Sequence, residues 1–198
     1  MANTGYEWEN YFQWDQGRAP RPFLLEALER FPADVSLRAI DLGCGDGKEA
    51  LILLARGWHV LAIDGAEAGI QRLIDQAPAE SLPRLQTQVT RFKGVILPPA
   101  DLILASYSLP FCRPQHFPAL WEQVAHSVKP GGRFAGNFFG PRDSWANVPK
   151  MTFHTAEQVR ALMDGLEIET FEETEEDGQS ANGPKHWHVF TVIARKWE

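Results

Sequence analysis

Two spacings of apolar residues alternate along the chain from residue 37 onward. Short, mostly apolar runs end in turn-forming residues and predict buried strands. Between them lie longer segments in which apolar residues recur every three or four positions, as on one face of a helix. The runs predict strands over residues 37–42, 58–63, 85–90, 101–106, 133–138, 166–171 and 186–196, and the longer segments predict helices over residues 47–56, 66–77, 115–128 and 155–163.

This order of elements is typical of an α/β protein with a mostly parallel sheet and helices on both faces. Right-handed crossovers bring the loops that follow parallel strands to one rim of the sheet, where ligands bind. The last two strands are expected to be antiparallel neighbours. We expect one domain over residues 1–198, in which residues 36–198 form the core and the helical, aromatic-rich residues 1–35 cover the rim as a lid.

The composition narrows the possible partners and the location of the protein. The chain has 198 residues, 44% hydrophobic and 23% charged, as in one globular domain, and no apolar run approaches a membrane span. A net charge of −7 without a basic stripe disfavours nucleic acid as a partner. The first eleven residues lack the pattern of a secretory signal, and the two cysteines lie far apart, which predicts a cytoplasmic protein with reduced thiols.

The candidate ligand-binding motif is Asp-Leu-Gly-Cys-Gly-Asp-Gly over residues 41–47, between a predicted strand and a predicted helix. Its glycines allow a sharp turn and a close approach of the backbone to a ligand, although similar glycines also occur in plain turns. The spacing differs from the Gly-x-Gly-x-x-Gly of dinucleotide-binding enzymes. Asp41 would repel a pyrophosphate but attract an ammonium group, which favours a cofactor with an amino-acid tail.

A second carboxylate supports this interpretation. Asp64 ends the next predicted strand, 23 positions after Asp41, near the interval expected for a ribose-binding acid. Its two oxygens can accept hydrogen bonds from both ribose hydroxyls. The alternative is a plain turn residue followed by Gly65.

With these motifs the chain resembles the class I S-adenosylmethionine-dependent methyltransferases. The resemblance rests on residues 41–47, Asp64, Ala-Asp-Leu-Ile-Leu at 100–104 and Lys-Pro-Gly-Gly at 129–132. The tail, residues 189–196, and the size of the chain are similar to the tellurite-resistance methyltransferase branch. The resemblance implies a Rossmann-like, doubly wound sheet of seven strands with an antiparallel last strand, and S-adenosyl-L-methionine as cofactor.

The resemblance also implies the cofactor-binding residues. It assigns Asp41 and the glycine loop to the methionine part and Asp64 to the ribose. Many relatives have an Asp after the third strand that contacts the adenine amine, but this chain has Thr-Arg-Phe at residues 90–92. Phe92 either stacks on the base or belongs to the core. The expected cofactor-binding residues are Asp41, Gly43, Cys44, Gly45, Asp64, Gly65, Phe92 and Ser106.

Candidates for substrate binding or for a general base come from the same rim. Tyr107 and Arg113 follow the fourth predicted strand, and Arg142 follows the fifth. An antiparallel last strand would begin at this rim with His186 and His188, which share one face of the strand. The His-x-His pair lacks a third ligand at a recognisable spacing, so no metal site is expected. The two histidines could instead be surface or structural residues, and Arg113 and Arg142 could be solvated loop charges.

The leading hypothesis is methyl transfer to a small molecule, with a metalloid oxyanion or a thiol as the acceptor that the branch suggests. Two alternatives stay open: a nicotinamide-dependent oxidoreductase, and a protein that binds S-adenosylmethionine as a sensor or docking module without turnover. The acidic run at residues 172–177 is interpreted as a solvated strand end and loop. The oligomeric state stays open.

Overall fold

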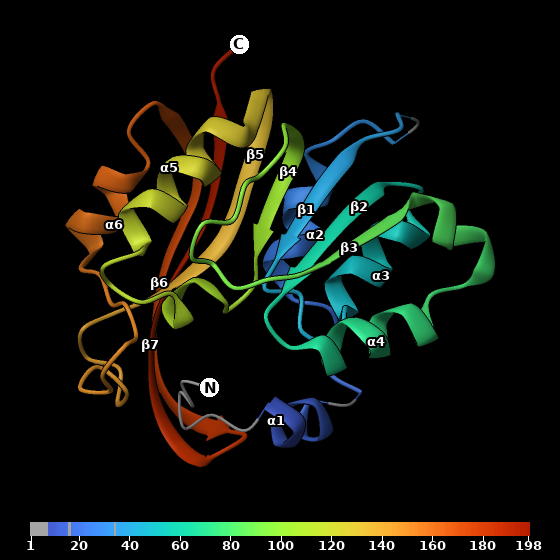
Figure 1. The fold of residues 1–198 in the computed structure, drawn as a ribbon. Coiled ribbons are helices and arrows are strands. Elements are labelled where there is room, and N and C mark those ends of the chain that lie inside the picture. The colour runs from blue at the N-terminus through green and yellow to red at the C-terminus, as the bar shows by residue number, and fades with distance from the viewer. Residues whose placement is uncertain (1–7, 16, 34) are drawn as a thin grey trace.

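Seven strands form one sheet in the order β3-β2-β1-β4-β5-β7-β6 in the computed structural model, which describes residues 8–15, 17–33 and 35–198 (Figure 1). The strands from β1 to β5 are parallel, and β7 is antiparallel to both of its neighbours. The expected fold class is confirmed. The strands are β1 (Arg38–Leu42), β2 (His59–Asp64), β3 (Leu85–Val89), β4 (Ala100–Ala105), β5 (Val128–Phe139), β6 (Leu166–Ser180) and β7 (Gly183–Lys196).

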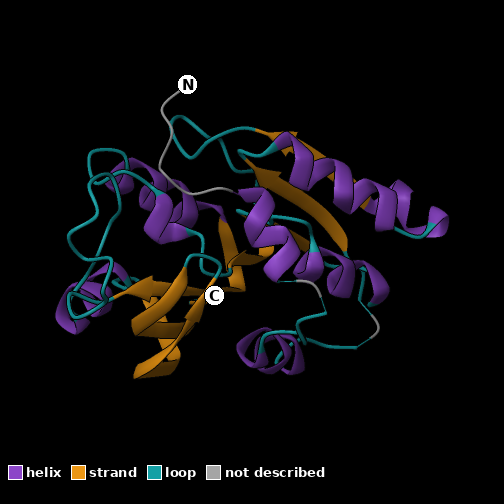
Figure 2. Cartoon of the chain, turned by 90° about the horizontal axis from the view of Figure 1, so that it is seen from below, coloured by secondary structure: helices purple, strands orange, loops and turns teal. Residues whose placement is uncertain are grey.

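Helices flank the sheet on both of its faces, as the view from below shows (Figure 2). One face packs against α2 (Pro22–Glu29), α3 (Lys48–Ala55) and α4 (Glu67–Gln76). The other packs against α5 (Phe117–Ser127) and α6 (Ala156–Leu162). Because both faces are covered, β1 and β4 are apolar on both sides. Two short 3₁₀ helices, η1 (Ala79–Arg84) and η2 (Leu109–Phe111), complete the connections, and no described helix has the length and apolarity of a membrane span.

The sequence pattern predicts that the fifth strand begins at residue 133. In the structure, β5 begins earlier, at Val128. Ala100 pairs with Val128 and Leu102 with Arg133, so residues 129–132 form a bulge within the strand. A Cβ on Gly132 would lie 2.8 Å from the carbonyl oxygen of Asp101. The Lys-Pro-Gly-Gly segment therefore follows the end of the preceding helix, as expected, and also belongs to the first part of β5.

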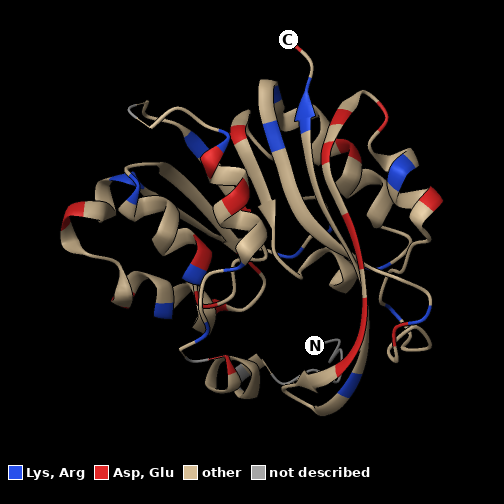
Figure 3. Ribbon diagram, turned by 180° about the vertical axis from the view of Figure 1, so that it is seen from behind, with Lys and Arg blue, Asp and Glu red and all other residues tan. Residues whose placement is uncertain are grey.

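The β6–β7 hairpin is longer than the sequence pattern predicts. The two strands pair from Leu166 and Lys196 to Ser180 and Gly183. The interpretation of residues 172–177 as a strand end and loop is wrong, because this acidic run is paired along its whole length with β7 (Figure 3). The partner strand carries apolar and basic residues that offset the cost of extending an acidic segment.

The amino-terminal segment divides between the rim and one face of the sheet. Helix α1 (Trp8–Trp14) lies beyond the lower end of the sheet in Figure 1, and its Phe12 is 1% exposed. Helix α2 packs on the face of the sheet rather than on the rim, since Leu24 and Ala27 belong to the core there. Residues 1–7, 16 and 34 of the expected lid lie outside the described residues.

His154 generates a prediction about stability in acid. Its ring lies 4.5 Å from the ring of Phe117 and 5.6 Å from that of Phe138, between centroids, and burial lowers its pKa to about 4. The ordinary histidine pKa is about 6.5, so the stabilising contribution is complete above that pH and is lost as the pH falls toward 4. We expect His154→Phe to reduce the drop in melting temperature between pH 7 and pH 5, measured by circular dichroism.

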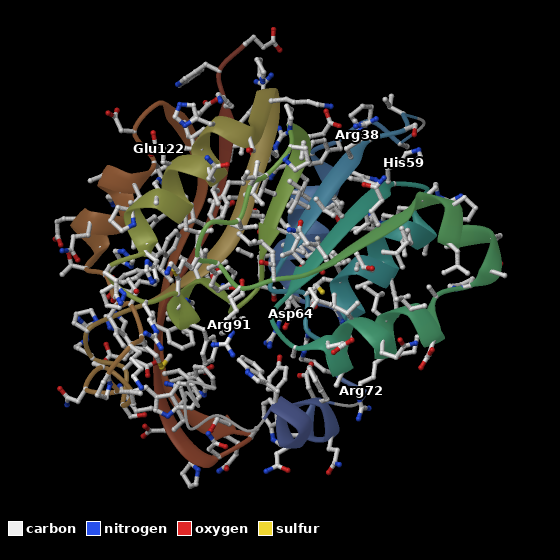
Figure 4. The ribbon with its side chains drawn as sticks, in the orientation of Figure 1. Arg38, His59, Asp64, Arg72, Arg91 and Glu122 are labelled. Atoms are coloured by element: carbon white, nitrogen blue, oxygen red, sulfur yellow. The ribbon has the colours of Figure 1, made fainter. Side chains whose placement is uncertain are left out.

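The control for this experiment is His59→Gln, since His59 is exposed at the opposite end of the sheet from the α1 side (Figure 4). This variant should keep the full acid-induced drop. An equally large drop in His154→Phe would contradict the assignment of the effect to His154.

Candidate active site

A cavity of about 1060 Å³ opens at the carboxyl ends of β1, β2 and β4 and is bounded by α1 and by one face of the β6–β7 hairpin. Asp64 and Arg91 lie at this end of the sheet, whereas Arg38 and His59 lie at the other (Figure 4). The parallel topology therefore gathers the loops that the sequence analysis singled out. The expected cofactor residues that line the cavity are Gly43, Cys44, Gly45, Asp64, Gly65, Phe92 and Ser106.

The glycine loop turns sharply because Gly43 and Gly45 have φ angles of 80° and 57°. The amides of Gly43 and Cys44 both donate to the carbonyl oxygen of Ile63, at 2.7 and 3.0 Å. A Cβ on Gly43 would collide with the side chain of Ser108, whose hydroxyl donates to Leu42 O at 2.5 Å. Only glycine allows the loop to pass this close to the end of β4.

The Asp64 carboxylate joins the loops that follow β1 and β2. Its Oδ2 accepts a hydrogen bond from the Gly45 amide at 2.9 Å, and its Oδ1 accepts one from the Ala66 amide at 2.7 Å. Burial raises the pKa of Asp64, and these backbone donors act in the opposite direction. A carboxylate has about four acceptor positions, so two further hydroxyls can bind from the cavity.

Asp41 does not line the cavity. It is 1% exposed beneath the glycine loop, and its Oδ2 has no hydrogen-bond partner among the described residues. Burial, and then the charges of Glu49 and Asp64, raise its pKa well above the ordinary range, while a hydrogen bond from the Ala50 amide opposes them. The carboxylates that face the cavity beside the loop are instead those of Asp46 and Glu49.

Ion pairs hold the end of α1 against the start of α3. Arg18 donates to Asp15 and to Glu49, both at 2.8 Å, and Lys48 pairs with Asp15 at 2.6 Å. Asp15 and Glu49 are buried, so this network is shielded from water and strengthened. It positions Trp8, Tyr11 and Trp14 along the cavity.

The stretch at residues 90–92 contributes two side chains. Phe92 lines the cavity and also packs against the core, so both expected roles are compatible with its position. Arg91 lines the cavity, and its guanidinium makes no hydrogen bond or ion pair within the described part of the chain.

Tyr107 and Arg113 also line the cavity. Tyr107 has a φ of 52°, an uncommon conformation for a non-glycine residue that is often found at functional sites. Its amide donates to Asn137 Oδ1 at 3.2 Å, and Asn137 Nδ2 donates to Thr191 Oγ1 at 2.9 Å. This chain of hydrogen bonds ties the strained residue to β5 and, through Asn137, to β7.

His186, His188 and Arg142 do not line the cavity and lie on the outer face of the hairpin. The Arg142 amide donates to Nδ1 of the buried His188, so the proton on Nε2 is directed to Glu173 at 2.9 Å. The Arg142 guanidinium pairs with Glu173 and Glu175, and His186 also pairs with Glu175 at 3.2 Å. These side chains neutralise the acidic strand and do not point toward the cofactor loops.

The alternation of side chains along β7 explains why the two histidines do not line the cavity, contrary to expectation. His186 and His188 share one face of β7, as expected, but Trp187, Val189 and Thr191 on the opposite face line the cavity. Among the described residues no group of three or more His, Cys, Asp or Glu side chains is placed to hold a metal ion.

A buried ion pair connects the start of β7 to the loop that follows β5. Lys185 and Asp143 have fully buried side chains and contact each other directly. Burial lowers the pKa of Lys185, and Asp143 opposes this shift. The Lys185 ammonium lies 4.2 Å from the ring centroid of Trp145, 4.3 Å from that of Trp187 and 5.0 Å from that of Phe139. Three aromatic rings therefore surround the cation.

Several residues that line the cavity are absent from the expected site residues, although the amino-terminal ones belong to the segment expected as a lid. They come from the amino-terminal helix, the loop after it and the inner face of β6, and comprise Trp8, Tyr11, Trp14, Arg18, Arg21, Glu172, Thr174 and Glu176. The aromatic spacing in α1 is visible in the sequence, whereas the length of β6 is masked by its acidic composition.

Comparison with known proteins gives one family match and several structural neighbours. Residues 27–173 match the model of the family described as tellurite resistance protein TehB. TehB from Haemophilus influenzae superposes with a TM-score of 0.75 at 19% identity, over 96% of this chain and 67% of that one. The 1,6-didemethyltoxoflavin-N1-methyltransferase of Burkholderia thailandensis superposes with a TM-score of 0.66 at 16% identity, over 96% and 85%. At these identities the likeness concerns the fold.

The curated relatives are longer than this chain. Trans-aconitate 2-methyltransferase of Azoarcus sp. (strain BH72) is 28% identical over 111 residues, which is 56% of this chain and 42% of the relative. Hemagglutinin 1 of Eikenella corrodens is 28% identical over 95 residues, which is 32% of that protein. The chain thus spans less than half the length of these two relatives.

The buried Lys185–Asp143 pair generates a stability prediction. In Lys185→Met the carboxylate of Asp143 would stay buried without its positively charged partner, and we expect a loss of about 3–5 kcal/mol in the free energy of unfolding. The matched control is Lys129→Met, because the Lys129–Asp101 pair at 3.0 Å is partly exposed and should contribute about 1 kcal/mol or less. Urea unfolding measures both, and equal losses would contradict the prediction.

Proposed function

The chain belongs to the family of the tellurite resistance protein TehB, and we propose that it transfers the methyl group of S-adenosylmethionine to a small-molecule acceptor bound in the cavity. The observation that carries the proposal is the position of Asp64, which lines the cavity and is tied to the glycine loop through Gly45. The carboxylate and the loop together suit a ligand that combines a ribose with a charged amino-acid tail.

The residues present fit this cofactor by their chemistry. Asp64 keeps acceptor capacity for a ribose diol, and Asp46 and Glu49 offer carboxylates to an ammonium group. Phe92 offers a ring face to a base, in place of the missing acidic residue. The cavity volume of about 1060 Å³ is slightly larger than the roughly 300–1,000 Å³ of a typical ligand site, so a second small molecule has room beside the cofactor.

The cofactor, when bound, supplies an electrophilic methyl group on a sulfonium. Asp64, Asp46 and Glu49 would hold the cofactor, which would supply this methyl group to a lone pair of the acceptor and would leave as S-adenosylhomocysteine. The task of the protein is then to hold the acceptor in line and to exclude water. Tyr107, Trp187 and Tyr11 surround the space beside the cofactor loops and are suited to this task.

No thiolate nucleophile of the protein is required in this scheme. Burial raises the pKa of Cys112 to about 11 and also raises that of Cys44, so both thiols are protonated near neutral pH. A metalloid oxyanion or a thiol is the acceptor that the sequence resemblance suggests, and each would arrive with a reactive lone pair.

Asp64→Ala tests the cofactor site. We expect a loss of about 10- to 100-fold in affinity for S-adenosylhomocysteine, measured by calorimetry, because charged hydrogen bonds to the ribose would be removed. Asp75→Ala on the exposed side of α4 is the matched control and should bind as the wild type does. Unchanged binding by Asp64→Ala would refute the assignment.

The same samples separate the alternatives. Release of S-adenosylhomocysteine from S-adenosylmethionine with tellurite, selenite and small thiols as acceptors tests turnover. Tight binding of NAD would favour an oxidoreductase, and cofactor binding without turnover on any acceptor would favour a sensor or docking module.

A further inference from the structure

The loop after β3 lies beside Asp64, on the side away from the glycine loop. The sheet order β3-β2-β1 places the end of β2, with Asp64, between the ends of the other two strands. Val89 pairs with Asp64 at the end of β3, and the Thr90 amide donates to the carbonyl oxygen of Asp64 at 2.8 Å. Residues 90–93 therefore continue the lining of the cavity beyond Asp64.

The position of this loop decides which part of a bound nucleoside it meets. A ribose carries its base and its amino-acid tail on the two carbons that flank the ring oxygen, so they leave the sugar on opposite sides. With the ribose at Asp64 and the tail at the glycine loop, the base extends toward residues 90–93. This placement rests on the proposed function.

Arg91 packs over Gly65, the residue directly after Asp64. A Cβ on Gly65 would lie 3.2 Å from Arg91 Cγ, and Gly65 is not among the glycines with a positive φ. The contact with Arg91, rather than the backbone conformation, therefore favours glycine at this position. The Arg91 side chain is exposed, and its guanidinium makes no hydrogen bond or ion pair among the described residues, so it is available to a ligand.

The side chains in this part of the cavity are mainly hydrogen-bond donors. Besides Asp64, the lining residues here are Gly65, Ala66, Thr90, Arg91, Phe92 and Lys93. Guanidinium and ammonium groups donate and do not accept. This described set contains no carboxylate or carboxamide that could accept from an amine on the base.

Adenine and a 6-oxopurine present opposite groups at C6. Adenine has an amine, a donor, next to the acceptor N7, whereas a 6-oxopurine has an oxygen, an acceptor, next to N7. An arginine matches the oxygen together with N7, and a glutamine matches the amine together with N7. A guanidinium that faces the amine forms no hydrogen bond with it, so Arg91 gives no preference for adenine.

We propose that Arg91 sets the base selectivity of the cofactor site, and that the site takes a nucleoside with a 6-oxopurine base at least as well as one with adenine. The Arg91 guanidinium donates to the oxygen at C6 and to N7. Asp64 and the glycine loop contact the ribose and the tail, which are the same in both nucleosides. The edge of the base therefore decides between the two.

Two ligands that differ only at this edge test the proposal. They are S-adenosylhomocysteine and S-inosylhomocysteine, in which an oxygen replaces the 6-amino group and N1 carries a hydrogen. We expect the wild type, measured by calorimetry, to bind S-inosylhomocysteine no more than about threefold more weakly than S-adenosylhomocysteine. In Arg91→Gln the preference should move toward S-adenosylhomocysteine by about tenfold or more, because the carboxamide accepts from the amine and donates to N7.

Arg38→Gln is the matched control, because Arg38 is exposed at the opposite end of the sheet (Figure 4). The ratio of the two affinities in this variant should equal that of the wild type. A purely structural role of Arg91 would weaken both ligands by the same factor in Arg91→Gln and leave the ratio unchanged.

The same two ligands separate this proposal from the proposed function. If the wild type binds neither of them, the proposed function fails. If it binds S-adenosylhomocysteine but binds S-inosylhomocysteine more than about threefold more weakly, the assignment of Arg91 alone is overturned. A change in the ratio of less than about tenfold in Arg91→Gln also overturns that assignment alone.

Discussion

The hydrogen bonds that the Asp64 carboxylate accepts from the amides of Gly45 and Ala66 connect the loops on which the rest of the site is built. These loops follow the neighbouring parallel strands β1 and β2. Without Asp64, the amides of Gly45 and Ala66 would lose the acceptor that they share. Burial makes the carboxylate costly to ionise, and the two backbone donors offset part of that cost. The same carboxylate both shapes the loop and presents its remaining lone pairs to the cavity.

The part of the site that depends on local sequence could be predicted. The sequence itself shows the glycines that adopt a positive φ and the strand that ends in Asp64. It also shows the short interval between them, so these features could be recognised without knowledge of the packing. Asp41 shows the limit of such reasoning. Its place before the glycine loop is clear, but the direction of its side chain follows from the packing of β1 against α3, which turns it toward the Ala50 amide instead of the cavity.

The other half of the site depends on register, which no local pattern reveals. His186 and His188 were expected at the rim, and β7 does begin there, but its pairing with β5 and β6 points the odd-numbered neighbours inward. The acidic run in β6 was likewise judged by its composition as loop. It pairs as a strand because Arg142 and the two histidines supply positive or donating groups to its outer face.

The two faces of the β6–β7 hairpin thus have different roles, because alternate residues point to opposite faces. Glu172, Thr174 and Glu176 of β6 and Trp187, Val189 and Thr191 of β7 line the cavity, while Glu175, Asp177 and His186 form ion pairs on the opposite face. Substitutions on the ligand side leave that outer network in place. The lining of the cavity and the stability of the hairpin therefore depend on different side chains of the same two strands.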